Sequence, residues 1–155
     1  MTAQASLFPE TAQERAERLD AEIWRLIVGG AGGRLNLPVG DDERAVLRKI
    51  RMHRGLQQAV SLRAIAEETH LDARQIKQAV RTLRVDYRLP IGSSKSASGG
   101  GYYLMFSDED LRVWRKDVLD QVRAQIEALN AAGGKHAALE VLGQLRVELE
   151  KEKAR

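Results

Sequence analysis

Cationic and amide side chains recur at helical spacing between residues 74 and 84. Arginine and glutamine can each make two hydrogen bonds to the edge of a guanine or an adenine, and lysine and arginine also pair with phosphate. The residues that we assign to base edges are Arg74, Gln75, Gln78 and Arg81. We assign Lys77 and Arg84 to phosphates. The pattern predicts a surface that binds double-stranded DNA.

A helix that reads DNA needs an apolar back that fixes it to its domain. At about 100° per residue, Val80 and Leu83 fall beside Ile76 on one face of this segment. The residues on the opposite face are Arg74, Gln78 and Arg81. This arrangement predicts an amphipathic helix with an outward cationic stripe. The alternative is that the stripe is only a solvated helix face, as most charged faces are.

A second basic feature follows this helix. Two extended segments, LPIGSS and GYYLMF, flank the small, polar sequence SKSASGGG, which predicts a β-hairpin with a long tip. The tip contains Lys95, Ser96 and Ser98. It has little use in packing and suits a wing that touches the minor groove or the DNA backbone. We therefore add these three residues to the predicted DNA contacts.

The distribution of charge supports a DNA-binding centre. The formal net charge is only +3, but residues 41–106 carry +5, and residues 1–40 and 107–155 carry −1 each. Positive charge concentrated on one part of a chain attracts the phosphate backbone. The middle segment is therefore the expected contact region.

Catalytic and metal-binding chemistry is not predicted. The chain has no cysteine, which excludes disulfides, thiolate zinc sites and a cysteine nucleophile. Its three histidines, His53, His70 and His136, are not paired at metal-ligand spacing. The acidic residues 41–43 and 108–110 stand at expected helix starts, where carboxylates stabilise exposed amides, although metal binding is the alternative. We expect no enzyme activity, no metal and no cofactor.

Two tryptophans could serve as stacking platforms for single-stranded bases. Trp24 and Trp114 both have apolar neighbours at helical spacing, so we expect them to pack inside the protein. The first ten residues lack the pattern of a signal peptide, and the apolar runs are too short to cross a membrane. We expect a cytoplasmic protein without a membrane segment.

The elements that must position these residues can be read along the chain. Thr11 and Glu14 form a capping-box pattern that begins a helix over residues 12–28. GGAGGRLNLPVG is interpreted as a linker, and the next helix is expected to begin with Asp41 as its cap and to stop at Gly55. LQQAVS is expected to be extended.

Two short helices then follow in close succession. Ser61 begins a helix that ends near Thr69, and Asp72 caps the cationic helix, with Gln75 completing a capping box. After the hairpin, Ser107 caps a long amphipathic helix, which AAGG separates from a last helix. The predicted fold class is mainly α: a winged helix-turn-helix of three helices plus a β-hairpin wing, with flanking N- and C-terminal helices.

This order divides the chain into three parts. Residues 1–40 form an N-terminal helix and a glycine-rich linker, residues 41–106 the winged helix-turn-helix domain, and residues 107–155 a C-terminal helical hairpin. The apolar stripes of the flanking helices exceed what a winged domain needs. We expect them to form a homodimer, and the alternative is that they fold back on the same chain.

The segment from Gly55 to Leu104 resembles the winged helix of bacterial biotin-repressor-type regulators, and more closely that of small phage or prophage winged-helix proteins. The resemblance covers about residues 42–106, and LPIGSS followed by GGGYYL is its more specific part. It implies DNA binding through Arg74, Gln75, Gln78 and Arg81, with wing contacts near Lys95. No biotin-ligase or sugar-binding domain follows, so the regulatory input of those families does not carry over.

Together these features predict sequence-specific binding of double-stranded DNA, either as a transcriptional regulator or as a phage-type replication or packaging factor. The rival hypothesis is a non-enzymatic interaction module that uses the winged fold and long helices to bind protein.

Overall fold

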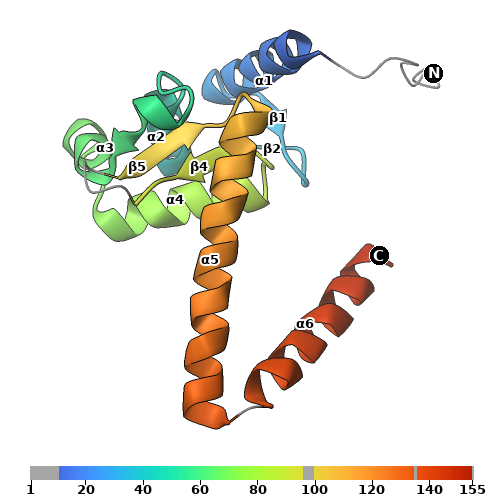
Figure 1. Ribbon diagram of the computed structural model, residues 1–155. Coiled ribbons are helices and arrows are strands. Elements are labelled where there is room, and N and C mark those ends of the chain that lie inside the picture. Colours follow the sequence, from blue (N-terminus) through green and yellow to red (C-terminus); the bar gives the residue numbers. More distant parts are fainter. Residues whose placement is uncertain (1–10, 96–99, 135, 155) are drawn as a thin grey trace. The chain divides into compact units, whose positions relative to one another are not determined.

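The computed structural model describes residues 11–95, 100–134 and 136–154. These residues form mainly helices, with short antiparallel strands between them (Figure 1). The α-helices are α1 (Ala12–Ile27), α2 (Asp41–Ile50), α3 (Leu62–Thr69), α4 (Ala73–Val85), α5 (Asp108–Gly133) and α6 (Ala137–Lys153). The strands are β1 (Ala31–Gly32), β2 (Leu37–Pro38), β3 (Val60–Ser61), β4 (Ile91–Ser93) and β5 (Gly101–Leu104).

Helices α2, α3 and α4 with the β4–β5 hairpin form a winged helix-turn-helix, which confirms the predicted fold class. β5 lies in the centre of a three-stranded antiparallel sheet in the order β3-β5-β4. Ile91 pairs with Leu104 and Ser93 with Tyr102, so β4 and β5 are the two sides of the wing. β3 pairs with β5 and immediately precedes α3, which ties the wing to the start of the helix-turn-helix.

One hydrophobic core holds these elements together. α4 contributes Ile76, Ala79, Val80 and Leu83, each at most 2% exposed. The helices α1 and α2 bury the residues Ile23, Leu26, Ile27, Val46, Leu47 and Ile50 in the same core. The periodicity of α4 therefore predicted its buried face correctly, because apolar residues at steps of three and four lie on one side of a helix.

Local capping explains the sharp turn between α3 and α4. Ser61 accepts a hydrogen bond from the amide of Ala64 at the start of α3. His70 ends that helix in the left-handed conformation, with φ of 59°. The side chain of Asp72 accepts from the amides of Arg74 and Gln75, and Gln75 completes the predicted capping box. Each cap satisfies amides that a helix start leaves unpaired, so α4 begins at a fixed residue.

Other local expectations need correction. Gly40, not Asp41, is the N-cap of α2, and Asp41 is the first helical residue, where its charge still suits the helix dipole. α2 ends at Ile50 rather than at Gly55. The segment expected to be extended contains a 3₁₀ turn at Leu56–Gln58, and only its end forms β3.

The glycine-rich segment after α1 is not an unstructured linker. It forms the β1–β2 hairpin, which the end of α4 holds in place: the amide of Arg34 donates to the carbonyl of Asp86 over 2.7 Å, and the hydroxyl of Tyr87 donates to the carbonyl of Pro38 over 2.8 Å. Gly33 has φ of +71°, and a Cβ there would lie 2.5 Å from the carbonyl oxygen of Asp86. Glycine therefore permits this close approach.

The chain divides after Trp114 into two compact units. The second unit holds most of α5 and all of α6. Its large apolar residues are partly or largely exposed, including Leu119 at 55%, Leu139 at 65% and Leu149 at 59%. Within the described residues, no helix is long and apolar enough to cross a membrane.

We predict that Gly33→Ala lowers the free energy of unfolding by about 2–4 kcal/mol, because alanine adds both left-handed backbone strain and overpacking against Asp86. Gly29→Ala is the matched control, since Gly29 has φ of +95° but no atom within 4 Å of an added Cβ. We expect the control to lose only the backbone part, about 1–2 kcal/mol. Urea denaturation measures both, and equal losses would contradict the close-contact explanation.

Candidate nucleic-acid interface

The outward face of α4 is an exposed cationic surface. The exposed side chains on this face are Arg74, Lys77, Gln78 and Arg81, and the buried side chains of α4 lie on the opposite face. In the part of the chain that the structure describes, no carboxylate forms an ion pair with Arg74, Lys77 or Arg81. These three charges are therefore available to an anionic partner. The neighbouring α3 differs, because its Arg63 pairs with Glu67 over 2.8 Å.

Gln75 is exposed like its neighbours but already has a structural contact. Its Oε1 accepts a hydrogen bond from the amide of Asp72 over 2.9 Å, as the second half of the capping box. Reading an adenine edge requires Oε1 and Nε2 of the amide to face the base together. The cap directs Oε1 of Gln75 toward the amide of Asp72, so a bidentate contact would have to turn the side-chain amide away from the cap.

Arg84, which we expected at a phosphate, is half-buried against the wing. Its Nε donates to the carbonyl of Ile91 in β4 over 2.7 Å, and its guanidinium carbon lies 5.9 Å from the ring centroid of Tyr102 and 6.0 Å from that of Trp114. Burial lowers the pKa of Arg84. These contacts connect the last turn of α4 to both strands of the wing and to the first turns of α5.

The wing itself is closed by backbone pairing up to the edge of its tip. The amide of Ser94 donates to the carbonyl of Gly101 over 2.9 Å, and Lys95 is exposed beyond this pair. A Cβ at Gly101 would clash with the backbone of Val60, so glycine lets β3 and β5 approach each other. Ser96 and Ser98, the other predicted wing contacts, lie outside the described residues.

Sequence reasoning missed one residue on the outward stripe. Val85 lies four residues after Arg81 and is 52% exposed. Positions 74, 78, 81 and 85 share one helical face, so the same spacing could have identified it. An exposed aliphatic side chain on this face can contact the methyl group of thymine.

The two tryptophans differ in burial. Trp24 is 53% exposed, and the guanidinium of Arg51 lies 4.9 Å from its ring centroid, so the prediction that Trp24 packs inside is wrong. α1 buries Ile23 and Leu26 instead, which turns the intervening Trp24 outward. Trp114 is half-buried near Arg84.

Of the acidic residues at the start of α5, Asp110 bonds to backbone amides. Asp110 accepts hydrogen bonds from the amides of Leu56 and Ser107, both over 3.3 Å. Over residues 11–95, 100–134 and 136–154, no three histidine or acidic side chains are grouped so that they could hold a metal ion. Asp108 and Glu109 instead pair with Arg15 and Arg112.

Known proteins offer a distant structural likeness. No protein-family model matches the chain, and no curated protein matches it. Among solved structures, a mutant of MepR from S. aureus is similar to it with 13% sequence identity and a TM-score of 0.36, over 98% of this chain and 97% of the other. A TM-score at this level supports no functional conclusion, so the function is inferred from the geometry of α4 and the wing.

We predict that Arg84→Met lowers the free energy of unfolding by about 1–3 kcal/mol, because the hydrogen bond to Ile91 is removed. Arg81→Met on the same helix is the control and should change stability by no more than about 0.5 kcal/mol, since Arg81 is exposed. Thermal and urea unfolding measure both variants. Equal stability of the two would show that Arg84 does not fix the wing.

Proposed function

We propose that this protein binds double-stranded DNA sequence-specifically, with α4 in the major groove. The observation that carries the proposal is the outward face of α4, which presents three cationic side chains without carboxylate partners in the described structure. Its apolar back is buried, so a helix held rigidly by the domain displays these charges. This combination suits a recognition helix, because bases are read by side chains whose backbone is fixed.

The side chains fall into different roles in this proposal. Arg74, Gln78 and Arg81 read base edges, and Lys77 lies toward the phosphates at the edge of the stripe. Gln75 keeps its capping contact. We reassign Arg84 from a phosphate contact to a residue that positions the wing. Lys95, with Ser96 and Ser98, contacts the backbone or minor groove from the wing tip.

We propose a role as a transcriptional regulator in the cytoplasm. The resemblance of the wing to small phage and prophage proteins keeps a replication or packaging role as the second candidate. The alternative from another class is a protein-interaction module. The salt dependence of binding distinguishes a DNA-binding protein from a protein-interaction module. Binding driven by phosphate contacts releases counterions and weakens steeply as the salt concentration rises.

We further propose that residues 41–106 contact DNA and that residues 107–155 join two copies of the chain. Several apolar side chains of α5 and α6 remain exposed in a single chain, including Val122 at 40%, Leu142 at 41% and Leu145 at 48%. Exposed apolar stripes of this length favour helix association. A dimer would bind two half-sites about one helical turn, or a multiple of it, apart.

Replacing Arg74 or Arg81 with alanine should weaken specific DNA binding by about 1–3 kcal/mol without changing stability. Arg115→Ala removes the same charge from an exposed position on α5 and should leave specific binding unchanged. Fluorescence anisotropy with selected duplexes measures the affinity at two salt concentrations. Unchanged binding by both α4 variants would remove this helix from the interface, and binding of a protein partner through α4 without DNA would favour the interaction module.

Leu145→Glu should convert a dimer to a monomer and weaken DNA binding on the order of 100-fold, because two linked half-site contacts gain avidity that one lacks. Gln144→Glu adds the same charge at the adjacent exposed position of α6 and is the control. Light scattering gives the mass of each protein beside its DNA affinity. A monomeric wild-type protein would contradict the proposed assembly.

A further inference from the structure

A wide, polar hollow lies at the end of α4 opposite the helix-turn-helix. It has a volume of about 640 Å³, and its walls come from α1, the β1–β2 hairpin and the residues that follow α4. The side chains that matter for its chemistry are Arg18, Glu22, Arg25, Arg34, Tyr87 and Arg88. None of these residues lies on the outward face of α4 or in the wing.

The walls of this hollow are fixed by tertiary contacts. The bonds from Arg34 to Asp86 and from Tyr87 to Pro38 hold the hairpin against the end of α4. The stem of Arg25 runs directly over Gly30, where an added Cβ would lie 2.5 Å from its Cγ. Arg88 has φ of 55°, a conformation that is uncommon outside glycine and that clusters at functional positions. The fold therefore fixes the backbone around the hollow that these arginines line.

The charge of the hollow is unbalanced. Of the described residues that line it, four are arginines and one, Glu22, is a carboxylate. Within residues 11–95, 100–134 and 136–154, no ion pair engages Arg25, Arg34 or Arg88. Nearby arginines do have partners, since Arg15 pairs with Asp108 over 2.8 Å and Arg54 with Asp20 over 2.5 Å. Among the described residues, the charges of Arg25, Arg34 and Arg88 at this hollow are therefore not neutralised by ion pairs.

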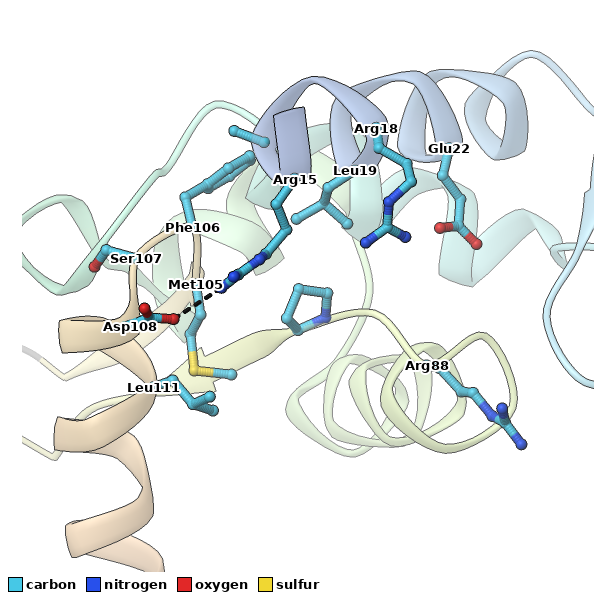
Figure 2. Close-up of a pocket in the computed structure, with 12 residues that line it drawn as sticks. Arg15, Arg18, Leu19, Glu22, Arg88, Met105, Phe106, Ser107, Asp108 and Leu111 are labelled. Carbon is cyan, nitrogen blue, oxygen red and sulfur yellow. Dashed lines mark hydrogen bonds and ion pairs between the residues drawn. The ribbon is translucent and has the colours of Figure 1, made fainter. Parts of the chain in front are cut away.

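A smaller pocket, lined by both apolar and charged residues, adjoins this charge. It has a volume of about 240 Å³ and shares Arg18, Glu22 and Arg88 with the hollow. Figure 2 shows Arg18 and Glu22 projecting from α1, whereas Arg88 projects away from Met105. The apolar residues that line it include Leu19, Pro90, Met105, Phe106 and Leu111. A ligand with both an uncharged ring and phosphate groups would find a surface for each.

We propose that Arg25, Arg34 and Arg88, which line this hollow, bind phosphate groups. Guanidinium groups pair with phosphate through two parallel hydrogen bonds, which suits this residue type in a cluster. The phosphate comes either from a free nucleotide or from the DNA backbone beyond the end of α4. Only the second source rests on the proposed DNA binding.

The test compares three full-length proteins. The first is the wild type, the second is Arg25→Gln/Arg34→Gln/Arg88→Gln, and the third, the control Arg115→Gln/Lys116→Gln/Lys153→Gln, removes the same charge from exposed helical positions. At position 25, glutamine keeps the part of the arginine side chain that packs on Gly30. Arg34→Gln alone is a milder variant at an exposed loop position, which remains informative if the triple variant unfolds.

Calorimetry with inorganic tripolyphosphate and with ATP tests the free ligand. We expect the hollow variant to bind at least about tenfold more weakly than the wild type and the control. The salt dependence of DNA affinity tests whether the phosphate belongs to the DNA backbone. The slope of log affinity against log salt concentration should become shallower by about 0.9 for each phosphate that the variant no longer neutralises. Either result supports the hollow as a phosphate site and identifies its source.

The proposal is overturned if the hollow variant matches the control in both measurements. Failure of the DNA-binding proposal has a different signature. In that case the wild type binds no duplex at any salt concentration, and the tripolyphosphate and ATP titrations alone decide whether the hollow binds phosphate.

Discussion

The burial of one face of α4 is the constraint on which the rest of the structure depends. Ile76, Val80 and Leu83 are buried in the core, where α4 contacts α2, α3 and β4, and burying each large aliphatic side chain stabilises the fold by about 1.5–3 kcal/mol. Because these residues fix the helix by its back, the positions between them face solvent and can carry charge without a desolvation cost. The same packing sets the direction of the chain at both ends of α4. The helix-turn-helix turn lies at its start, and the β1–β2 hairpin at its end.

Sequence alone was sufficient where local signals determine structure. The capping residues Thr11, Ser61 and Asp72 begin their helices as predicted, because each satisfies amides within three residues of itself. The wing was predictable from a change of periodicity. The β1–β2 hairpin was not predictable, because strands of two residues have little intrinsic preference for extended structure. It depends on hydrogen bonds with the carbonyl of Asp86 and the hydroxyl of Tyr87, which are far away in sequence.

The candidate site shows the same division. Exposure of Arg74, Gln78 and Arg81 follows from helix geometry once Ile76 is placed inward. The half-buried position of Arg84 does not follow from helix geometry alone, because its partner, the carbonyl of Ile91, belongs to a strand whose placement depends on the whole fold. Trp24 was predicted wrongly for a related reason. Helical spacing allowed more than one face of α1 to be buried, and the face that packs against α2 does not contain Trp24.

In the proposed function, DNA contacts both the outward face of α4 and the wing. Amide chemical-shift changes of the isotopically labelled full-length protein, recorded during titration with a short duplex, test this most directly. The largest changes should fall on residues 73–85 and near Lys95, with smaller changes on α3. Changes confined to α5 and α6, or none at duplex concentrations that saturate an anisotropy signal, would contradict it.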